Sequence, residues 1–137
     1  MSLEQARQSI VAAIEAAKVG CPNGVPIIEY DNRIIVDTQT ASAPFLNVEI
    51  HFIQGEQADL SAAPRHRYYG QMHLMAAAKE GAGVAQQLTM LNHFSPQLQR
   101  KQFGGVRTKM STMAPKMHLK GWLYYPCVIP FWYDLID

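Results

Sequence analysis

The sequence predicts an α+β fold, with two helices packed on a mixed, mostly antiparallel β-sheet. Two segments place apolar residues at helical spacing, several others alternate apolar and polar residues, and the loops between them suit antiparallel pairs. The expected order is αββββαββ. The 137 residues contain no linker or repeat, so we expect a single domain over residues 1–137.

The first helix is predicted over residues 2–17, where apolar residues recur every three or four positions. Ser2 is a suitable N-cap, Gln5 completes a capping box, and Gly20 ends the helix. Turn residues occupy positions 21–26. The chain is therefore expected to leave this helix through a tight turn.

Four strands are expected next. Residues 27–30 and 34–36 are predicted to form a hairpin, followed by a polar loop. Residues 46–52 show the clearest alternation in the chain. A polar loop over residues 54–64 then leads to residues 65–76, which we expect to pair antiparallel with the preceding strand.

The second helix is predicted over residues 84–94, where Val84, Leu88, Leu91 and Phe94 share one face. It should stop before Pro96 and cover one face of the sheet. A strand over residues 106–112 leads to the final strand.

The final strand, over residues 121–133, holds six of the 13 aromatic residues and both tryptophans. Pro126 and Pro130 have the same parity, so their missing N–H groups lie along one edge, which suits an edge or bulged strand. Odd-numbered residues should form one face and even-numbered residues, including Trp122 and Trp132, the other. Both faces are apolar, which indicates a partner.

Charge and cysteine content exclude some classes of function. Twelve Lys and Arg residues nearly balance 11 Asp and Glu residues, so the net charge of +1 provides no global field for nucleic acid or membrane. Cys21 and Cys127 lie far apart and are interpreted as structural, reduced residues. No apolar stretch has the length of a membrane helix, and the start lacks the features of a secretion signal, so we expect no membrane contact.

No pattern of catalytic residues predicts an enzyme, and no cofactor or metal is expected. His51 and His73 lie on neighbouring predicted strands and could meet, but a carboxylate and a third ligand are missing from the pattern. Basic residues gather near Arg67 and again at Arg107 and Lys109, beside aromatic residues. Such clusters bind phosphate backbones, and they equally occur on solvated strand faces, so both interpretations stay open.

Several passages, in this order, resemble the tail terminator (tail completion) proteins of long-tailed bacteriophages and prophages. The resemblance spans nearly the whole chain and rests on the order of weak signals. The passages are the first helix, Ile28-Glu-Tyr-Asp-Asn32, Pro44-Phe-Leu-Asn-Val-Glu-Ile50, Arg65-His-Arg-Tyr-Tyr-Gly-Gln71, Gly105-Val106, and Gly121-Trp122 leading to Val128-Ile-Pro-Phe131.

The resemblance implies a small structural subunit without an active site. Such subunits assemble as a homo-oligomeric ring, usually a hexamer, on the tail tube protein. The ring stops tube polymerisation and provides the surface to which the head-completion (neck) protein docks. It implies a location in the virion tail, after assembly in the host cytoplasm.

On this interpretation, we expect contacts with the neighbouring subunit or the tail tube at Asp59, Arg65, Arg67, Trp122 and Trp132. Arg107 and Lys109 are expected to face the lumen, with transient, non-specific contact to double-stranded DNA. The loops over residues 37–44 and 54–64 would engage the tube or the neighbours.

Three alternatives remain open at this stage. The nearest is a head–tail connector (neck) protein of the same virion. The second is a small enzyme that uses His51, His73 or Cys127. The third is a small nucleic-acid-binding module, which would bind as a monomer with strong salt dependence.

Overall fold

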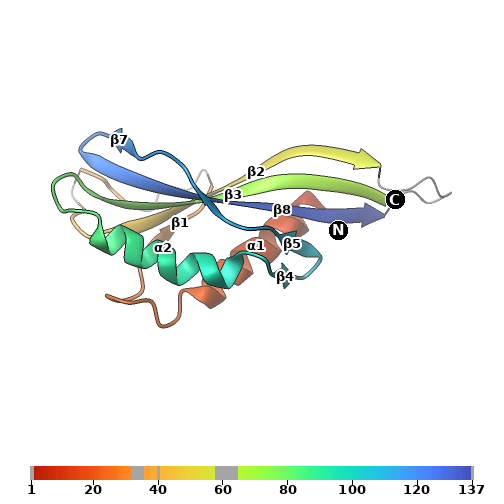
Figure 1. The fold of residues 1–137 in the computed structure, drawn as a ribbon, viewed down its shortest axis with the longest axis horizontal. Helices are drawn as coiled ribbons and strands as arrows, with labels where there is room; N and C mark the ends of the chain where they lie inside the picture. Colours follow the sequence, from red (N-terminus) through yellow and green to blue (C-terminus); the bar gives the residue numbers. More distant parts are fainter. Residues whose placement is uncertain (1, 32–35, 40, 58–64, 137) are drawn as a thin grey trace.

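A computed structural model describes residues 2–31, 36–39, 41–57 and 65–136. Two helices lie along one face of a long, curled sheet (Figure 1). The elements are α1 (Leu3–Ala17), β1 (Ile28–Glu29), β2 (Phe45–Gln57), β3 (Arg65–Lys79), α2 (Ala85–Leu98), β4 (Gln102–Phe103), β5 (Val106–Thr108), β6 (Thr112–Met113), β7 (Met117–Leu119) and β8 (Trp122–Ile136). The predicted α+β class is confirmed.

The sheet is mixed and mostly antiparallel. Its strand order is β1-β2-β3-β8-β5-β4, and β6 and β7 also pair with β8. β1 runs parallel to β2, whereas each of the other described pairs is antiparallel. Three long strands, β2, β3 and β8, therefore form the centre of the sheet.

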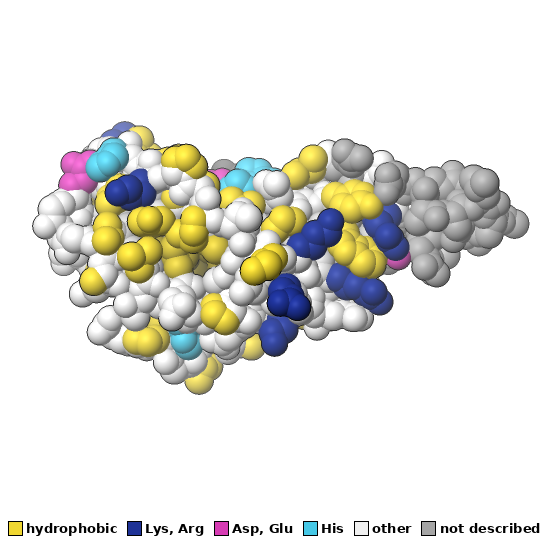
Figure 2. Space-filling view, in the orientation of Figure 1, with side chains coloured by type: hydrophobic (Ala, Val, Ile, Leu, Met, Phe, Trp, Pro, Cys, Tyr) yellow, Lys and Arg dark blue, Asp and Glu magenta, His cyan; other side chains and the backbone are white. Residues whose placement is uncertain are grey.

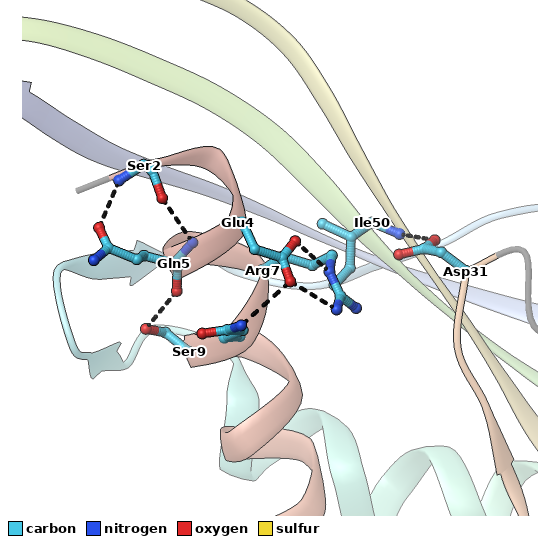
Figure 3. Close-up of polar contacts among 8 residues, drawn as sticks. Ser2, Glu4, Gln5, Arg7, Ser9, Asp31 and Ile50 are labelled. Carbon is cyan, nitrogen blue, oxygen red and sulfur yellow. Dashed lines mark hydrogen bonds and ion pairs between the residues drawn. The ribbon is translucent and has the colours of Figure 1, made fainter.

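The start of α1 agrees with its predicted capping box (Figure 3). The Ser2 hydroxyl accepts a hydrogen bond from the Gln5 backbone N–H at 3.1 Å, and the Gln5 side chain accepts one from the Ser2 N–H at 2.8 Å. These bonds satisfy two donors that the first turn of a helix leaves unpaired. The inner face of α1 buries Ala6, Ile10 and Ile14 against the sheet and α2.

The strands predicted over residues 46–52 and 65–76 are confirmed, and both are longer than expected. A register shift between Phe52 and Gln54 marks a β-bulge, after which pairing with β3 resumes and continues to Gln57. The expectation of a loop at residues 54–57 was wrong, because the bulge interrupts the two-residue period without ending the strand. Residues 58–64 lie outside the described part.

The two prolines of β8, Pro126 and Pro130, face the same side of the strand. On one side, β8 pairs with β3 along the whole of both strands. On the other side, the Pro126 carbonyl accepts from Ala114 N–H at 3.1 Å and the Pro130 carbonyl from Lys109 N–H at 2.8 Å. The N and carbonyl groups of one strand residue point the same way, so both missing N–H groups face this second side, as predicted. The partners there are the short strands β5, β6 and β7, so β8 lies inside the sheet. The expectation of an edge strand was wrong, because three short strands pair around the two prolines in place of one continuous strand.

β1 was expected to form a hairpin with residues 34–36, but it pairs with a different segment. β1 pairs in parallel with β2, through Ile28 and Glu29 opposite Leu46 and Asn47. The buried Glu29 carboxylate accepts hydrogen bonds from the Val36 N–H at 2.8 Å and the Asn47 side chain at 2.9 Å, which ties β1 to β2. Residues 32–35 lie outside the described part, and Val36 is in no strand.

Three expectations about the second half of the chain were also wrong. Helix α2 runs through Pro96 to Leu98, because the Leu98 side chain is fully buried in the core and holds the last turn in place. Leu88 is exposed, and the buried face of α2 is instead Gln87, Met90, Leu91 and Phe94. The single strand predicted over residues 106–112 is divided between β5 and β6.

The main core lies between the helices and one face of the sheet. The odd-numbered residues of β8 from Cys127 to Tyr133 are buried there, as predicted. A second, smaller cluster on the other face consists of Val36, Phe45, Ala77 and Trp122. Within the described residues, no helix is long and apolar enough to cross a membrane.

Candidate interaction surface

The fold brings together four of the residues singled out in the sequence: Arg67, Trp132, Arg107 and Lys109. β3, β8 and β5 are neighbours, with Tyr69 opposite Trp132 and Trp132 opposite Arg107. We call Arg67, Tyr69, Arg107, Lys109 and Trp132 the Trp132 cluster. Figure 2 shows Lys and Arg side chains around hydrophobic ones near β4, β5 and the adjoining end of β8.

Each cation of the Trp132 cluster lies over an aromatic ring. The Arg67 guanidinium carbon is 4.0 Å and the Arg107 guanidinium carbon 5.0 Å from the centroid of the Trp132 ring. The Lys109 ammonium is 5.9 Å from the centroid of the Tyr69 ring. Attraction between a cation and the face of a ring favours these positions, so the rings orient the charges.

Arg67 is held by a second contact. Its Nε and Nη2 atoms donate to the two carboxylate oxygens of Asp134 at 2.9 and 3.2 Å. This bidentate pair raises the pKa of the Arg67 guanidinium above its usual value, so Arg67 stays charged. Arg107 and Lys109 are exposed.

Two further cations reach the same flank of the sheet. Arg100 N–H donates to the Lys109 carbonyl at 3.1 Å, and the Lys101 carbonyl accepts from Thr108 N–H at 2.9 Å. Thr108 fixes this connection, since its buried hydroxyl donates to the Leu98 carbonyl and accepts from the Lys101 N–H. The end of α2 therefore places the exposed Arg100 and Lys101 beside β5.

Trp122 belongs to a different part of the molecule. Its side chain is 1% exposed, packs edge-on against Phe45, and donates from Nε1 to the Thr38 carbonyl at 2.9 Å. The chain's own residues cover it, so the expectation that Trp122 contacts a partner was wrong. Asp59 lies outside the described residues, and of Arg65 the structure describes only the backbone, at the start of β3.

His51 and His73 meet across β2 and β3, as the predicted pairing implied. Their ring centroids are 4.6 Å apart. Burial and the neighbouring His51 lower the pKa of His73 below its usual value, while Glu49 partly opposes the shift. Within the described residues, no group of three or more His, Cys, Asp or Glu side chains is arranged to hold a metal ion.

Both cysteines are free thiols in buried positions. Burial raises the pKa of the Cys21 and Cys127 thiols above the usual value. A raised pKa keeps a thiol protonated and poorly nucleophilic at neutral pH. This environment matches the structural role predicted for the two residues.

A second exposed feature is the methionine-rich segment before β8. Met110, Met113, Met117 and Leu119 are between 47% and 64% exposed. We call these four residues the methionine segment. It lies along β8, and Met117 and Leu119 border a groove of about 360 Å³ that Asn47, Glu49, Met75, His118 and Tyr124 complete. In Figure 2, hydrophobic side chains gather toward the end that carries β7.

Comparison with known proteins adds one finding. No family model and no curated protein matches the chain. Among solved structures, 25 chains match, and one of them aligns over 100% of this chain and 96% of its own, with a TM-score of 0.68 and 14% sequence identity. At that identity the likeness is one of fold alone, and it extends over the entire chain.

Proposed function

We propose that this protein is a phage tail terminator (tail completion) protein. It forms a homo-oligomeric ring, a hexamer, that caps the tail tube, stops further polymerisation and provides the head-docking surface. The ordered set of resembling passages supports this proposal, as does the confirmed α+β fold with both helices on one face. The protein acts by assembly, in the virion tail.

The observation that carries the proposal is the methionine segment. Four large apolar side chains within ten residues remain exposed along β8. Met117 and Leu119 pair with Tyr124 and Trp122 on one face of β8, whereas Met113 pairs with Cys127 on the face of the helices, so the segment exposes apolar side chains on both faces beside β8. Exposed apolar side chains gathered in one place mark contact surfaces, and methionine adapts its shape to a partner. Burying these side chains against a neighbouring subunit would remove them from water and stabilise the assembly.

The opposite edge of the sheet offers a different surface. Among the described residues, β1 pairs with β2 only at Leu46 and Asn47, so most of the outer edge of β2 has no strand partner. Near its far end, Phe52 and Ile53 are exposed. Two unlike patches on opposite flanks suit a heterologous contact, in which each subunit uses one flank for each neighbour and the series closes into a ring.

The test is the mass of the assembly, measured across concentration and combined with negative-stain microscopy. We expect rings for the natural chain and loss of rings for the double variant Met113→Gln and Met117→Gln. Leu88→Gln, an exposed apolar residue on α2, is the matched control and should leave rings intact. A natural chain that stays monomeric even beside tail tubes would refute the proposal.

A further inference from the structure

We propose that the Trp132 cluster is a binding site for the phosphate backbone of duplex DNA. This inference deepens the proposed function and rests on it only for the source of the DNA, which passes through the finished tail. Arg67 and Trp132 were expected at subunit contacts, and Arg107 and Lys109 in the lumen. The structure joins all four on one surface, and we assign them one role.

The charge of this surface selects an anionic ligand. Arg67, Arg107 and Lys109 contact the two rings, and the exposed Arg100 and Lys101 extend the same flank. Asp134 offsets one of these five charges through its pair with Arg67. The net charge of the whole chain is only +1, so this concentration of cations is local. Several separated cations on one flank match the repeating negative charges of a phosphate backbone, and they can neutralise several phosphates at once.

The geometry favours a duplex backbone over unstacked bases. Proteins that bind single strands leave aromatic faces free for bases to stack on. Here, Arg67 and Arg107 lie over the Trp132 ring, and Lys109 lies over Tyr69. The rings therefore orient cations, and the outward guanidinium and ammonium groups are what a ligand meets.

The cluster is also organised before binding. β3 and β8 pair along their whole length, which fixes the spacing of Arg67 and Trp132. Arg67 is further held by Asp134 and keeps its charge. Side chains that are already held in place lose less conformational entropy on binding than free ones do. A few contacts to phosphates are then enough for favourable binding, without recognition of the bases.

The experiment measures binding of a fluorescent duplex of about 30 base pairs across a salt series, because the salt slope falls by roughly 0.9 for each phosphate that the protein no longer neutralises. The double variant Arg107→Gln and Lys109→Gln should bind more weakly and lower the slope by about 1.8. The matched control is Lys79→Gln with Lys116→Gln. Both lysines are exposed and lie about 6.0 Å from an aromatic centroid, so the control makes the same change of charge away from the cluster.

Tryptophan fluorescence locates the ligand. Trp122 is buried near the opposite end of β8, so a change in emission on adding the duplex reports on Trp132. We expect Trp132→Phe to lose most of that change. Thermal unfolding of each variant establishes that it remains folded.

Three results would overturn the proposal: equal loss of affinity in the control, tighter binding of a single strand than of the duplex, or equal binding of polyglutamate. The last would identify a carboxylate-bearing protein partner instead. These assays use the isolated protein and do not require tail capping. A chain that binds the duplex through this cluster but forms no ring would contradict the proposed function alone.

Discussion

Replacing Gly70 by alanine tests the close contact at the centre of the long sheet. A Cβ atom at this position would lie 2.4 Å from Cζ of Phe131 and 2.5 Å from the carbonyl oxygen of His51. Ordinary contacts between carbon atoms are about 3.5–4.0 Å, so a neighbour must move by roughly 1 Å. One of the two neighbours is the backbone of β2 and the other a fully buried ring, and neither moves easily.

The expected cost follows from two opposing effects. Overpacking a core costs roughly 1–3 kcal/mol, and the rigid neighbours place Gly70→Ala near the upper end. Reduced freedom of the unfolded chain offsets about 0.4–1 kcal/mol of that cost. We therefore expect a loss of about 2 kcal/mol in the free energy of unfolding, seen as a fall of roughly 6–12 °C in Tm.

Gly55→Ala is the matched control, since Gly55 also lies in a strand of the same sheet. Its Cβ would lie 2.7 Å from the ring of Tyr68, a partly exposed side chain that stacks on the Tyr133 ring and would have to shift. We expect Gly55→Ala to cost about 1 kcal/mol in the free energy of unfolding, less than Gly70→Ala, because a partly exposed ring shifts more easily than strand backbone and a buried ring. Equal effects of the two variants, measured by denaturant unfolding, would refute the reasoning.

Three further variants test separate parts of the structure. Burial and His51 lower the pKa of His73, so the unfolded chain binds a proton more readily than the folded chain. The free energy of unfolding therefore falls as pH drops below 6.5. His73→Gln should reduce that fall, measured by denaturant unfolding across pH. Thr108→Val leaves the Leu98 carbonyl without its buried donor and should cost about 1–3 kcal/mol in urea unfolding. Ser2→Ala removes the N-cap of α1 and should cost about 1 kcal/mol, measured in the same way.

Thr108→Val and Ser2→Ala each have a control in an exposed residue of the same type. Thr112→Val and Ser42→Ala change exposed residues and should alter stability by less than about 0.5 kcal/mol. If a control matched its test variant, the interaction assigned to that residue would be wrong.

The sequence predicted elements whose pattern is local and regular. The capping box at Ser2 and Gln5 needs only four residues, and the two faces of β8 follow from strict alternation. The prolines of β8 predicted which side of the strand lacks two N–H groups, but not that three short strands would pair on that side. These parts of the fold could be predicted without knowledge of distant contacts.

The errors arose where distant contacts decide the structure. Leu98 keeps α2 helical beyond Pro96 because its side chain is buried by other elements. The bulge at Ile53 shifts the alternation of apolar and polar residues by one position, so the pattern did not predict that β2 continues beyond it. For the candidate site, the sequence singled out Arg67, Arg107 and Lys109 separately, and their common surface depends on the pairing of β3, β8 and β5. The burial of Trp122 depends on the chain around Thr38.

On the proposed function, this protein ends tail-tube growth as a ring. The most direct measurement adds the purified protein to polymerising tube protein and records tube lengths and end structures by electron microscopy. We predict that tubes stop growing once a ring sits at one end, and that the double variant at Met113 and Met117 leaves growth unchanged. Tubes that continue to lengthen with the natural protein, or protein bound to filled heads instead of tube ends, would contradict the claim.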